Sequence, residues 1–573
     1  MQQVFFLIRF LLLAVSAYGS LRFLRKYLPA EFCFGVYFSV IGSVLFLAGI
    51  LNFLREAAWC LFLAGLLLAG LSVRQKLSPA GLCCWGTAFF LAFGSLLFFL
   101  LRGSIFVEYD DFSHWALASR ILTRYDRFPN FQDTYVLFTS YPVGSAAFVY
   151  YVTEILGSSA EWLQMYAQGM LMVGMAVSLF AFARNAVQAL AAALCAVVLL
   201  CGCIPFTSLL VDTLLPLVGL SAAAFFLYCG KKPGKNIWVF IPYSIFLLSI
   251  KNSGVFFVAI LFVLLFLTYR REYALKIWAA LACMPVAALL LWQKHVRQVF
   301  ANGLMGKHSM SPFYFYAMLQ RKGLGEIGQE IQSVLTQMAE KTVSLSNHAL
   351  WVLAWGLLLW LVLRYYRRAD ADKAGRTLLL AAASYLFYQL GTLGMYLFSM
   401  PASEAMRLAG YERYHQSIVL FLTGLVLLET LQALDALRLP TRWEPVPLLA
   451  ALAVCFFTVA PGFSFFKKQQ YQTSERYHYD TLIEAYQIPQ EADYLILVRE
   501  ERQDYGFLDH LTQYLLNPRD YRIVKDCDLS GVDSSDVNYV IAFEQSEKIE
   551  EFLAALSPDA APVVCLREPA EEY

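Results

Sequence analysis

Long apolar runs separated by short polar turns recur along most of the chain. A helix needs about 20 apolar residues to cross a bilayer, and about 17 is the short limit. By this rule the sequence predicts about 14 transmembrane helices. The candidate ranges are 3–20, 31–51, 57–73, 80–101, 161–183, 188–203, 209–229, 236–250, 254–269, 276–293, 347–364, 376–399, 415–434 and 446–463.

The pattern changes after residue 463, where polar and charged residues become frequent. Two short apolar runs there, 494–498 (YLILV) and 538–542 (NYVIA), are typical of strands, and 506–516 and 546–556 have helical periodicity. The sequence therefore predicts an α-helical polytopic membrane protein with a small C-terminal α/β domain at 464–573. This domain has no Gly-rich phosphate loop, so we assign it no chemistry.

Composition supports a membrane protein, because 59% of the residues are hydrophobic and 15% are charged. Soluble domains have about 25% charged residues. The net charge of +1 gives no reason to expect a nucleic-acid partner. The lipid bilayer is the expected environment.

Basic residues in the short loops indicate orientation, because such loops are usually cytoplasmic. If the N-terminus is outside, all of these basic loops are cytoplasmic. The loops 102–160, 295–345 and 400–414 and the C-terminal domain are then extracytoplasmic. The apolar segment 142–156 would break this alternation if it crossed, so we expect it to be an interfacial helix or shallow hairpin on the outer side. The basic loops contain Arg22, Arg25, Lys26, Arg74, Lys76, Lys231, Lys232, Lys235, Arg270, Arg271, Lys276, Arg364, Arg367, Arg368, Arg438 and Arg442.

An acidic cluster opens the segment 107–129, in the first large outer loop. The segment has an amphipathic helical pattern, with apolar residues on one side and Arg120, Arg124 and Arg127 on the other, typical of a helix on a membrane surface. Asp110 and Asp111 either cap this helix or provide a carboxylate that takes a proton from a hydroxyl group, with or without a metal ion. His114, one turn later, is either a metal ligand or an interfacial hydrogen-bonding group.

Three further positions are candidates for substrate binding. Tyr141 lies in TSYPVG, which fixes the entry into the next apolar segment or is simply a turn. Asp212, at the outer end of a span, either caps a helix or takes part in function. Lys251, between two spans, either extends toward water or binds a phosphate group.

The stretch 403–414 (SEAMRLAGYERY) is a charged and aromatic helical pattern that leads into an apolar span. Pairs within the helix would explain Glu404 and Arg407. Alternatively, Arg407 and Arg413 hold a phosphate or pyrophosphate, since arginine binds such groups through two parallel hydrogen bonds. Glu404 and Tyr414 are then further candidates for substrate binding. The loop 295–345, with its aromatic run PFYFY, is expected to cover a groove or to lie on lipid without a chemical role.

Together these residues resemble the GT-C superfamily of multi-spanning glycosyltransferases, which includes the protein O-mannosyltransferases and the aminoarabinose transferases. The resemblance covers roughly residues 80–435 and consists of short motifs. They are an acidic pair in the first large outer loop, a Tyr-Pro entry, an Asp in the second outer loop, a Lys-x-x-Gly turn (Lys251, Gly254) and a late Arg-Tyr motif. The runs YDDFSHWA, YPVG and VDTLLPL look like uncharacterised GT-C-type proteins of Gram-positive bacteria.

The resemblance implies an inverting enzyme of the bacterial cell membrane. A polyprenyl-phosphate-linked sugar would be the donor, and a glycan, teichoic acid, glycolipid or protein of the cell envelope would be the acceptor. Asp110 would be the general base, Asp111 would orient the acceptor or help to bind a divalent metal such as Mg or Mn, and Asp212 would shape the pocket. Lys251 and Arg413 would stabilise the leaving phosphate. The chain departs from the family pattern in an N-terminal extension and in Val143, which stands where a second proline is common.

This interpretation divides the chain into an N-terminal transmembrane extension (1–79), a catalytic transmembrane domain (80–463) and the C-terminal domain. Two alternatives remain open. A polysaccharide polymerase or ligase acting on lipid-linked glycans would also use arginines in outer loops, but would not need the acidic pair. A lipid or glycan transporter would tend to show inverted repeats and charges near mid-membrane, whereas here the charges gather at the predicted outer boundary.

Overall fold

The computed structural model divides the chain into two compact units. The first comprises residues 1–104 and 118–467, and the second comprises 105–117 and 468–573. The structure describes residues 2–75, 79–202, 204–230, 234–300, 315–316, 320, 324–366, 368–437, 443, 445–459, 471–557, 559 and 561–568.

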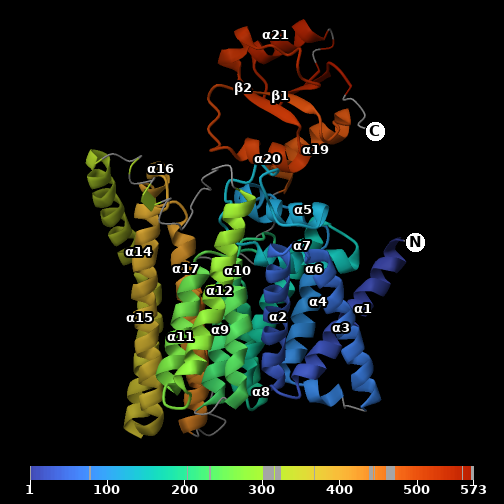
Figure 1. Ribbon diagram of the computed structural model, residues 1–573. Helices are drawn as coiled ribbons and strands as arrows, with labels where there is room; N and C mark the ends of the chain where they lie inside the picture. The colour runs from blue at the N-terminus through green and yellow to red at the C-terminus, as the bar shows by residue number, and fades with distance from the viewer. Residues whose placement is uncertain are drawn as a thin grey trace. The chain divides into compact units, whose positions relative to one another are not determined.

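The first unit is a bundle of helices, shown in blue to orange in Figure 1. Among the described residues, eight helices are long and apolar enough to cross a membrane, and six shorter apolar helices accompany them. Each range proposed from the sequence coincides with one of these helices, but length and composition support a crossing only for the eight long ones. The long helices are α1 (Gln2–Leu24), α2 (Ala30–Ile50), α3 (Leu54–Arg74), α7 (Glu161–Ala176, continued by a 3-10 turn), α12 (Leu275–Val299), α14 (Leu324–Tyr366), α15 (Arg368–Phe398) and α17 (Tyr411–Leu437); the shorter ones are α4 (Trp85–Leu101), α8 (Ala186–Leu200), α9 (Leu214–Cys229), α10 (Phe240–Ile250, preceded by a 3-10 turn), α11 (Gly254–Tyr269) and α18 (Pro445–Val459).

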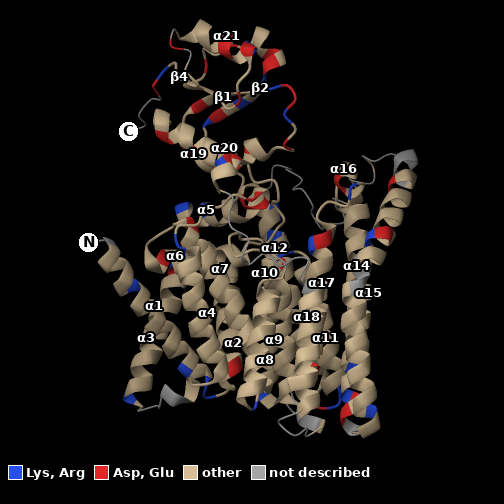
Figure 2. Cartoon of the chain, turned by 180° about the vertical axis from the view of Figure 1, so that it is seen from behind, with Lys and Arg blue, Asp and Glu red and all other residues tan. Residues whose placement is uncertain are grey.

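Three of the loops predicted to be cytoplasmic, those after α1, after α3 and before α10, meet at one end of this bundle. The basic residues Lys76, Lys231, Lys232, Arg367, Arg438 and Arg442 lie outside the described residues. Arg25 Nε donates to the carbonyl of Gly81 at 2.7 Å, and Lys26 Nζ donates to the side chain of Gln75 at 2.9 Å, which joins the loops after α1 and α3. Asn236, before α10, reaches the carbonyl of Tyr27 at 3.4 Å. Figure 2 shows Lys and Arg at this end of the bundle. The described short loops at this end of the bundle thus carry basic residues.

Residues 142–156, expected at the outer interface, contain α6 (Gly144–Leu156). This helix has 13 residues, and 11 of them are buried, so it packs inside the bundle rather than lying with one exposed face on its surface. Its first residue meets Ser249 at the end of α10, while Glu154 near its last turn accepts a hydrogen bond from Trp59 at the start of α3. Because both ends of α6 meet helix termini at the same end of the bundle, α6 does not run from one end to the other.

Two predicted loops differ from expectation. Much of the predicted loop 295–345 is helical, because residues up to Val299 belong to α12 and residues from Leu324 belong to α14. Most of the stretch between them, including much of PFYFY, lies outside the described residues. Val334 and Met338 give α14 a buried stripe that its polar composition conceals. The stretch 403–414 is not one helix, because a left-handed backbone at Leu408 and Gly410 separates α16 (Ala402–Ala405) from α17.

The second unit contains a four-stranded sheet in the order β2-β1-β3-β4. The predicted strands correspond to β1 (Asp493–Val498) and β3 (Tyr539–Ala542), and the predicted helices to α20 (Phe507–Leu516) and α21 (Glu547–Leu556). The edge strands β2 (Asp520–Lys525) and β4 (Val563–Cys565) and the helix α19 (Glu475–Tyr486) were not predicted. The strand β2 is parallel to β1, β1 is parallel to β3, and β4 is antiparallel to β3.

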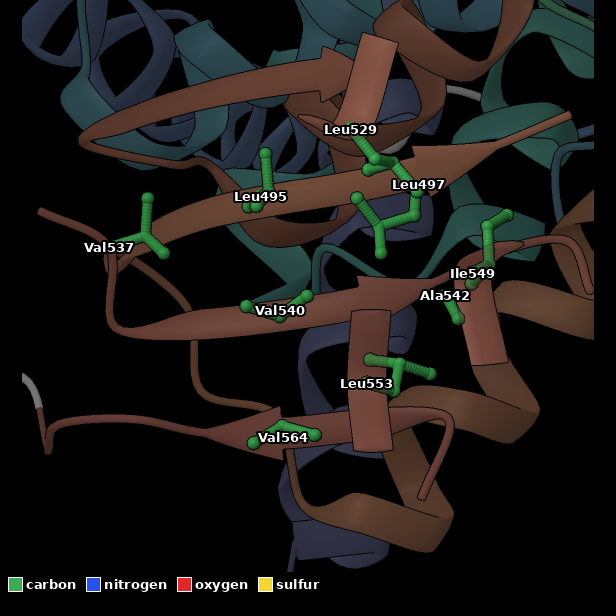
Figure 3. Packing of buried hydrophobic residues seen from close by; sticks show 9 residues of the cluster. All are labelled: Leu495, Leu497, Leu529, Val537, Val540, Ala542, Ile549, Leu553 and Val564. Carbon is green, nitrogen blue, oxygen red and sulfur yellow. The ribbon is translucent and has the colours of Figure 1, made fainter. Parts of the chain in front are cut away.

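The core of this unit forms between the sheet and α21. Figure 3 shows Leu495 and Leu497 of β1 and Val540 of β3 gathered with Ile549 and Leu553 of α21. Both faces of β1 are covered, because five of its six residues are buried. Coverage on both faces explains why the YLILV run is continuously apolar, as is usual for a central parallel strand.

Residues 105–117 belong to this second unit rather than to the bundle. They contain the π-helix η2 (Asp111–Trp115), which continues into α5 (Ala116–Tyr125). The ring of Phe112 lies 5.1 Å from that of Tyr514, and the ring of Tyr109 stacks on Phe507 at 6.0 Å. The predicted acidic loop is therefore an integral part of the fold that the C-terminal residues form.

Candidate functional site

The candidate site lies in the helical unit, where three segments that are distant in sequence present charged side chains to one another. Asp212 lies in the loop between α8 and α9, Lys251 in the turn between α10 and α11, and Arg413 in the first turn of α17. Asp212 and Lys251 are buried, with 2% and 8% of their surfaces exposed. Charged residues are rarely so buried unless they are paired.

The turn that carries Lys251 requires the glycine at position 254. The backbone at Lys251 is extended, which ends α10, and the N–H of Gly254 then donates to the Lys251 carbonyl at 2.8 Å and begins α11. A Cβ atom on Gly254 would lie 2.0 Å from the carbonyl oxygen of Leu247. The close approach of the two helices therefore depends on glycine here, and it fixes the position of the lysine.

The loop that carries Asp212 is held by hydrogen bonds from neighbouring helices. Gln168 of α7 donates to the carbonyl of Leu210 at 3.2 Å, and Ser417 of α17 donates to the carbonyl of Asp212 at 2.9 Å. Both side chains are buried. The aspartate is thus positioned by polar groups inside an otherwise apolar bundle, where each such bond also avoids the cost of an unsatisfied backbone group.

Lys251 Nζ donates to Asp212 Oδ1 at 2.8 Å, which makes a buried ion pair. Arg413 Nη1 lies 3.9 Å from Asp212 Oδ2, and the ammonium of Lys251 lies 4.8 Å from the centre of the Tyr414 ring. Burial alone would raise the pKa of Asp212, but the charges of Lys251 and Arg413 outweigh it and hold this pKa below its ordinary value. One carboxylate thus faces two cations.

A cavity of about 230 Å³ opens beside Lys251. Its polar end is formed by Lys251, Asn252, Ser253, Tyr141 and Tyr414. The remainder runs between α11 and α15 and is lined mainly by apolar groups: Phe256, Phe315, Tyr388, Gly391, Thr392, Gly394, Met395, Phe398 and Ser399. A cavity with one cation at one end and an apolar body matches a ligand that has an anionic head and a hydrocarbon chain.

The structure thus brings together five of the seven residues proposed for substrate binding: Asp212, Lys251, Arg413, Tyr414 and Tyr141. Tyr141, Lys251 and Tyr414 line the cavity, whereas Asp212 and Arg413 join Lys251 in the ion cluster without lining it. Glu404 and Arg407 do not line the cavity either; they lie before the break at Leu408, on the segment whose Met406 carbonyl accepts a hydrogen bond from Gln337 of α14. Arg127, on the predicted basic face, forms a bidentate ion pair with Asp133 at 2.6 and 3.1 Å. This pair gives Arg127 a structural partner in place of a lipid headgroup.

The proposed catalytic pair lies in the second unit. Asp111 is fully buried in η2, and Asp110 directly precedes that helix without forming a capping hydrogen bond to it. A π-helix is uncommon, and short ones occur frequently at functional sites. Asp110 therefore does not cap η2 through a side-chain hydrogen bond.

The proposed metal ligands Asp110 and His114 do not belong to a close group of three ligands. In the part of the chain that the structure describes, the one such group is Glu500, Asp526 and Cys527, at the carboxyl ends of β1 and β2. Exposed acidic groups of this kind are common without an ion. We therefore derive no chemical step through a metal.

Sequence reasoning missed the residues that support the site rather than carry its charge. Gln168 and Ser417 hold the Asp212 loop, and Thr392 and Met395 line the cavity from α15. Gln168 had a signal, because an uncharged polar residue inside an apolar helix usually makes a specific hydrogen bond. Thr392 and Met395 had no such signal, since the sequence around them in α15 has the pattern of an ordinary transmembrane helix.

The fold and the site define a protein rich in apolar helices, compatible with a multi-pass membrane protein, that carries a buried charged cluster at one end of the bundle. No family model, curated protein or solved structure matches the chain. The assignment of a function therefore depends on the chemistry of the site itself.

Proposed function

We propose that the protein is a membrane glycosyltransferase that moves a sugar from a polyprenyl-phosphate donor to a cell-envelope acceptor on the outer face of a bacterial membrane. The observation that carries the proposal is the position of Lys251 at the polar end of an otherwise apolar cavity. Its ammonium has three N–H donors, and Asp212 accepts one of them. The others suit a phosphate, while the space between α11 and α15 suits the first isoprene units.

Transfer would form a bond from C1 of the sugar to the acceptor oxygen and break the bond from C1 to the phosphate oxygen, with inversion at C1. The lipid phosphate would leave with the bonding electrons, and Lys251 and Arg413 would stabilise its negative charge. The proton of the acceptor hydroxyl would pass to a carboxylate. The resemblance assigns this role to Asp110, and we retain that assignment as a proposal.

The division into units supports the predicted topology. Residues 105–117 and 468–573 form one compact unit, so they must lie on the same side of a membrane. The chain between them must then cross an even number of times. Five long and five shorter apolar helices lie between them, which gives an even number if all ten cross and α6 does not. This count agrees with the predicted placement of the acidic loop and the C-terminal domain on the same side of the membrane.

The test is a transfer assay with the purified full-length protein, polyprenyl-phosphate sugars and a membrane glycan extract. We expect wild type to release sugar from the lipid, and we expect Lys251→Met and Asp110→Asn to reduce release at least about 100-fold, the usual scale for an electrostatic stabiliser or a general base. Lys276→Met, which removes an exposed lysine at the other end of the bundle, is the matched control.

Each other outcome points elsewhere. Release that survives Asp110→Asn would move the general base to another carboxylate, first to Asp111. Release that survives Lys251→Met in folded protein would remove the donor-phosphate role. If no donor is used by folded wild type, the ligase and transporter alternatives would replace the transferase.

A further inference from the structure

A second cavity, of about 320 Å³, lies in the same helical unit but shares no lining residue with the first. It is enclosed by α1, α2, α4, α6 and α7, which Figure 1 shows in blue to teal. Its walls are almost entirely apolar, and they include Leu13, Phe38, Phe90, Phe148, Leu156 and Met170. The site proposed for glycosyl transfer does not account for it.

This cavity opens at the surface of the bundle between α1 and α4. Among its lining residues, Leu91 of α4 is 62% exposed, and Ala14 of α1 and Ser95 of α4 are also exposed. The helix α1 is itself a surface helix, since only 17% of its most apolar window is buried. In a membrane, this opening would face lipid chains.

A cation lies close to the cavity. Arg9 of α1 precedes the lining residue Phe10, and its guanidinium packs on Gly157, which follows the lining residue Leu156. The packing is so close that a Cβ atom on Gly157 would lie 1.9 Å from Arg9 Nη1. The left-handed backbone of Gly157 ends α6, and a cation is favourable beside the free carbonyl groups of a helix C-terminus.

Arg9 is exposed, and it forms no ion pair or hydrogen bond with any residue in the described part of the chain. An arginine within an apolar helix is costly unless it reaches water or an anion. Leu13 and Ala17 follow Arg9 along one stripe of α1 and line the cavity. At about 1.5 Å per residue they lie about 6 and 12 Å along the helix from Arg9, a spacing that an acyl chain can follow from a headgroup at the arginine.

We propose that this cavity is a binding site for one anionic phospholipid, with its phosphate on Arg9 and an acyl chain between α1 and α4. The arginine fork complements a phosphate, and the apolar walls complement the chain. Such a lipid would fill a gap that the protein's own side chains leave between α1 and α4. The proposal does not depend on glycosyl transfer, so the two can fail separately.

The experiment is native mass spectrometry of the purified full-length protein. The protein is first stripped of lipid and then incubated with phosphatidylglycerol, phosphatidylcholine or undecaprenyl phosphate. We expect wild type to retain one phosphatidylglycerol at least tenfold better than phosphatidylcholine. Arg9→Gln should remove this preference, and Arg9→Lys should keep part of it. Ala14→Trp, which fills the exposed mouth, should abolish retention, while Arg271→Gln, which removes an exposed arginine at the basic end, should match wild type.

Size-exclusion profiles establish that each variant is folded before its lipids are counted. Equal retention of the two phospholipids by wild type, or unchanged preference in Arg9→Gln, would overturn the proposal. Stronger retention of undecaprenyl phosphate than of phosphatidylglycerol, lost in Arg9→Gln, would overturn the assignment to a phospholipid and identify a second isoprenoid site.

Discussion

Removing the ammonium of Lys251 should destabilise the helical unit strongly. Lys251→Met keeps most of the side-chain volume but leaves Asp212, whose side chain is 3% exposed, without the hydrogen bond at 2.8 Å. Arg413, at 3.9 Å and 31% exposed, compensates only in part. Breaking a buried ion pair by removing one partner costs about 3–5 kcal/mol, and with Arg413 still present we expect the lower part of that range, about 3 kcal/mol.

The pairwise part of this loss can be isolated in a double-mutant cycle. Asp212→Asn alone should also cost about 3 kcal/mol, because it leaves the lysine buried beside an amide. The double variant should cost clearly less than the sum, with a coupling energy of about 2–3 kcal/mol. Unfolding by sodium dodecyl sulfate in mixed micelles gives these free energies, with Lys276→Met as the control. Additive single effects would refute the reasoning, since they would mean that the two charges do not interact in the folded state.

Three further predictions concern other parts of the chain. In the C-terminal unit, Arg502 is 9% exposed and pairs with Glu475, Asp504 and Glu544 at 2.6–2.7 Å. Arg502→Met should therefore destabilise this unit by about 2–4 kcal/mol. Hydrogen exchange of α20 in the full-length protein measures this loss, and unchanged exchange would contradict the prediction. Burial opposes ionisation of Asp504, but the N–H groups of Leu508 and Gly506 and the charge of Arg502 hold its pKa below the ordinary value. The stabilisation that the ionised Asp504 gives is therefore complete at neutral pH and is lost as the pH falls below that ordinary value. Asp504→Asn should accelerate hydrogen exchange at pH 7 but no longer at strongly acidic pH, and an equal effect at both pH values would exclude this linkage. Gly254→Ala should lower the free energy of unfolding by about 2 kcal/mol or more because of the clash with Leu247. Gly70→Ala, where an added Cβ atom meets nothing within 4 Å, should be neutral or stabilising by up to about 1 kcal/mol. The same detergent unfolding compares the two variants, and similar values for both would disprove the tight turn.

Local patterns were enough to predict the elements whose periodicity is strong. The apolar runs located the helices of the bundle, and YLILV located the central strand β1, since both signals depend on residues close together in sequence. The edge strands were missed because β2 (DYRIVK) is polar and β4 has three residues. The break before α17 was missed because Leu408 has a left-handed backbone, which its residue type disfavours.

The site shows a similar limit. Residue type and position at a helix end singled out Asp212, Lys251 and Arg413, but not the ion pairs among them, which join positions 39 and about 200 residues apart. The grouping of 105–117 with the C-terminal residues was equally invisible, because it depends on contacts such as that between Phe112 and Tyr514. Sequence patterns identify the groups that are costly to bury, and the fold decides which of them meet.

Photo-crosslinking of a polyprenyl phosphate is the most direct test of the central claim, that the cavity beside Lys251 binds the lipid donor. A probe with a photoreactive group on its first isoprene units would be irradiated with the full-length protein, and the labelled peptides would be identified by mass spectrometry. We predict label on α11 and α15, near Phe256 and Thr392, and at least about tenfold less label in Lys251→Met. Label that avoids these helices, or that persists in folded Lys251→Met, would contradict the account.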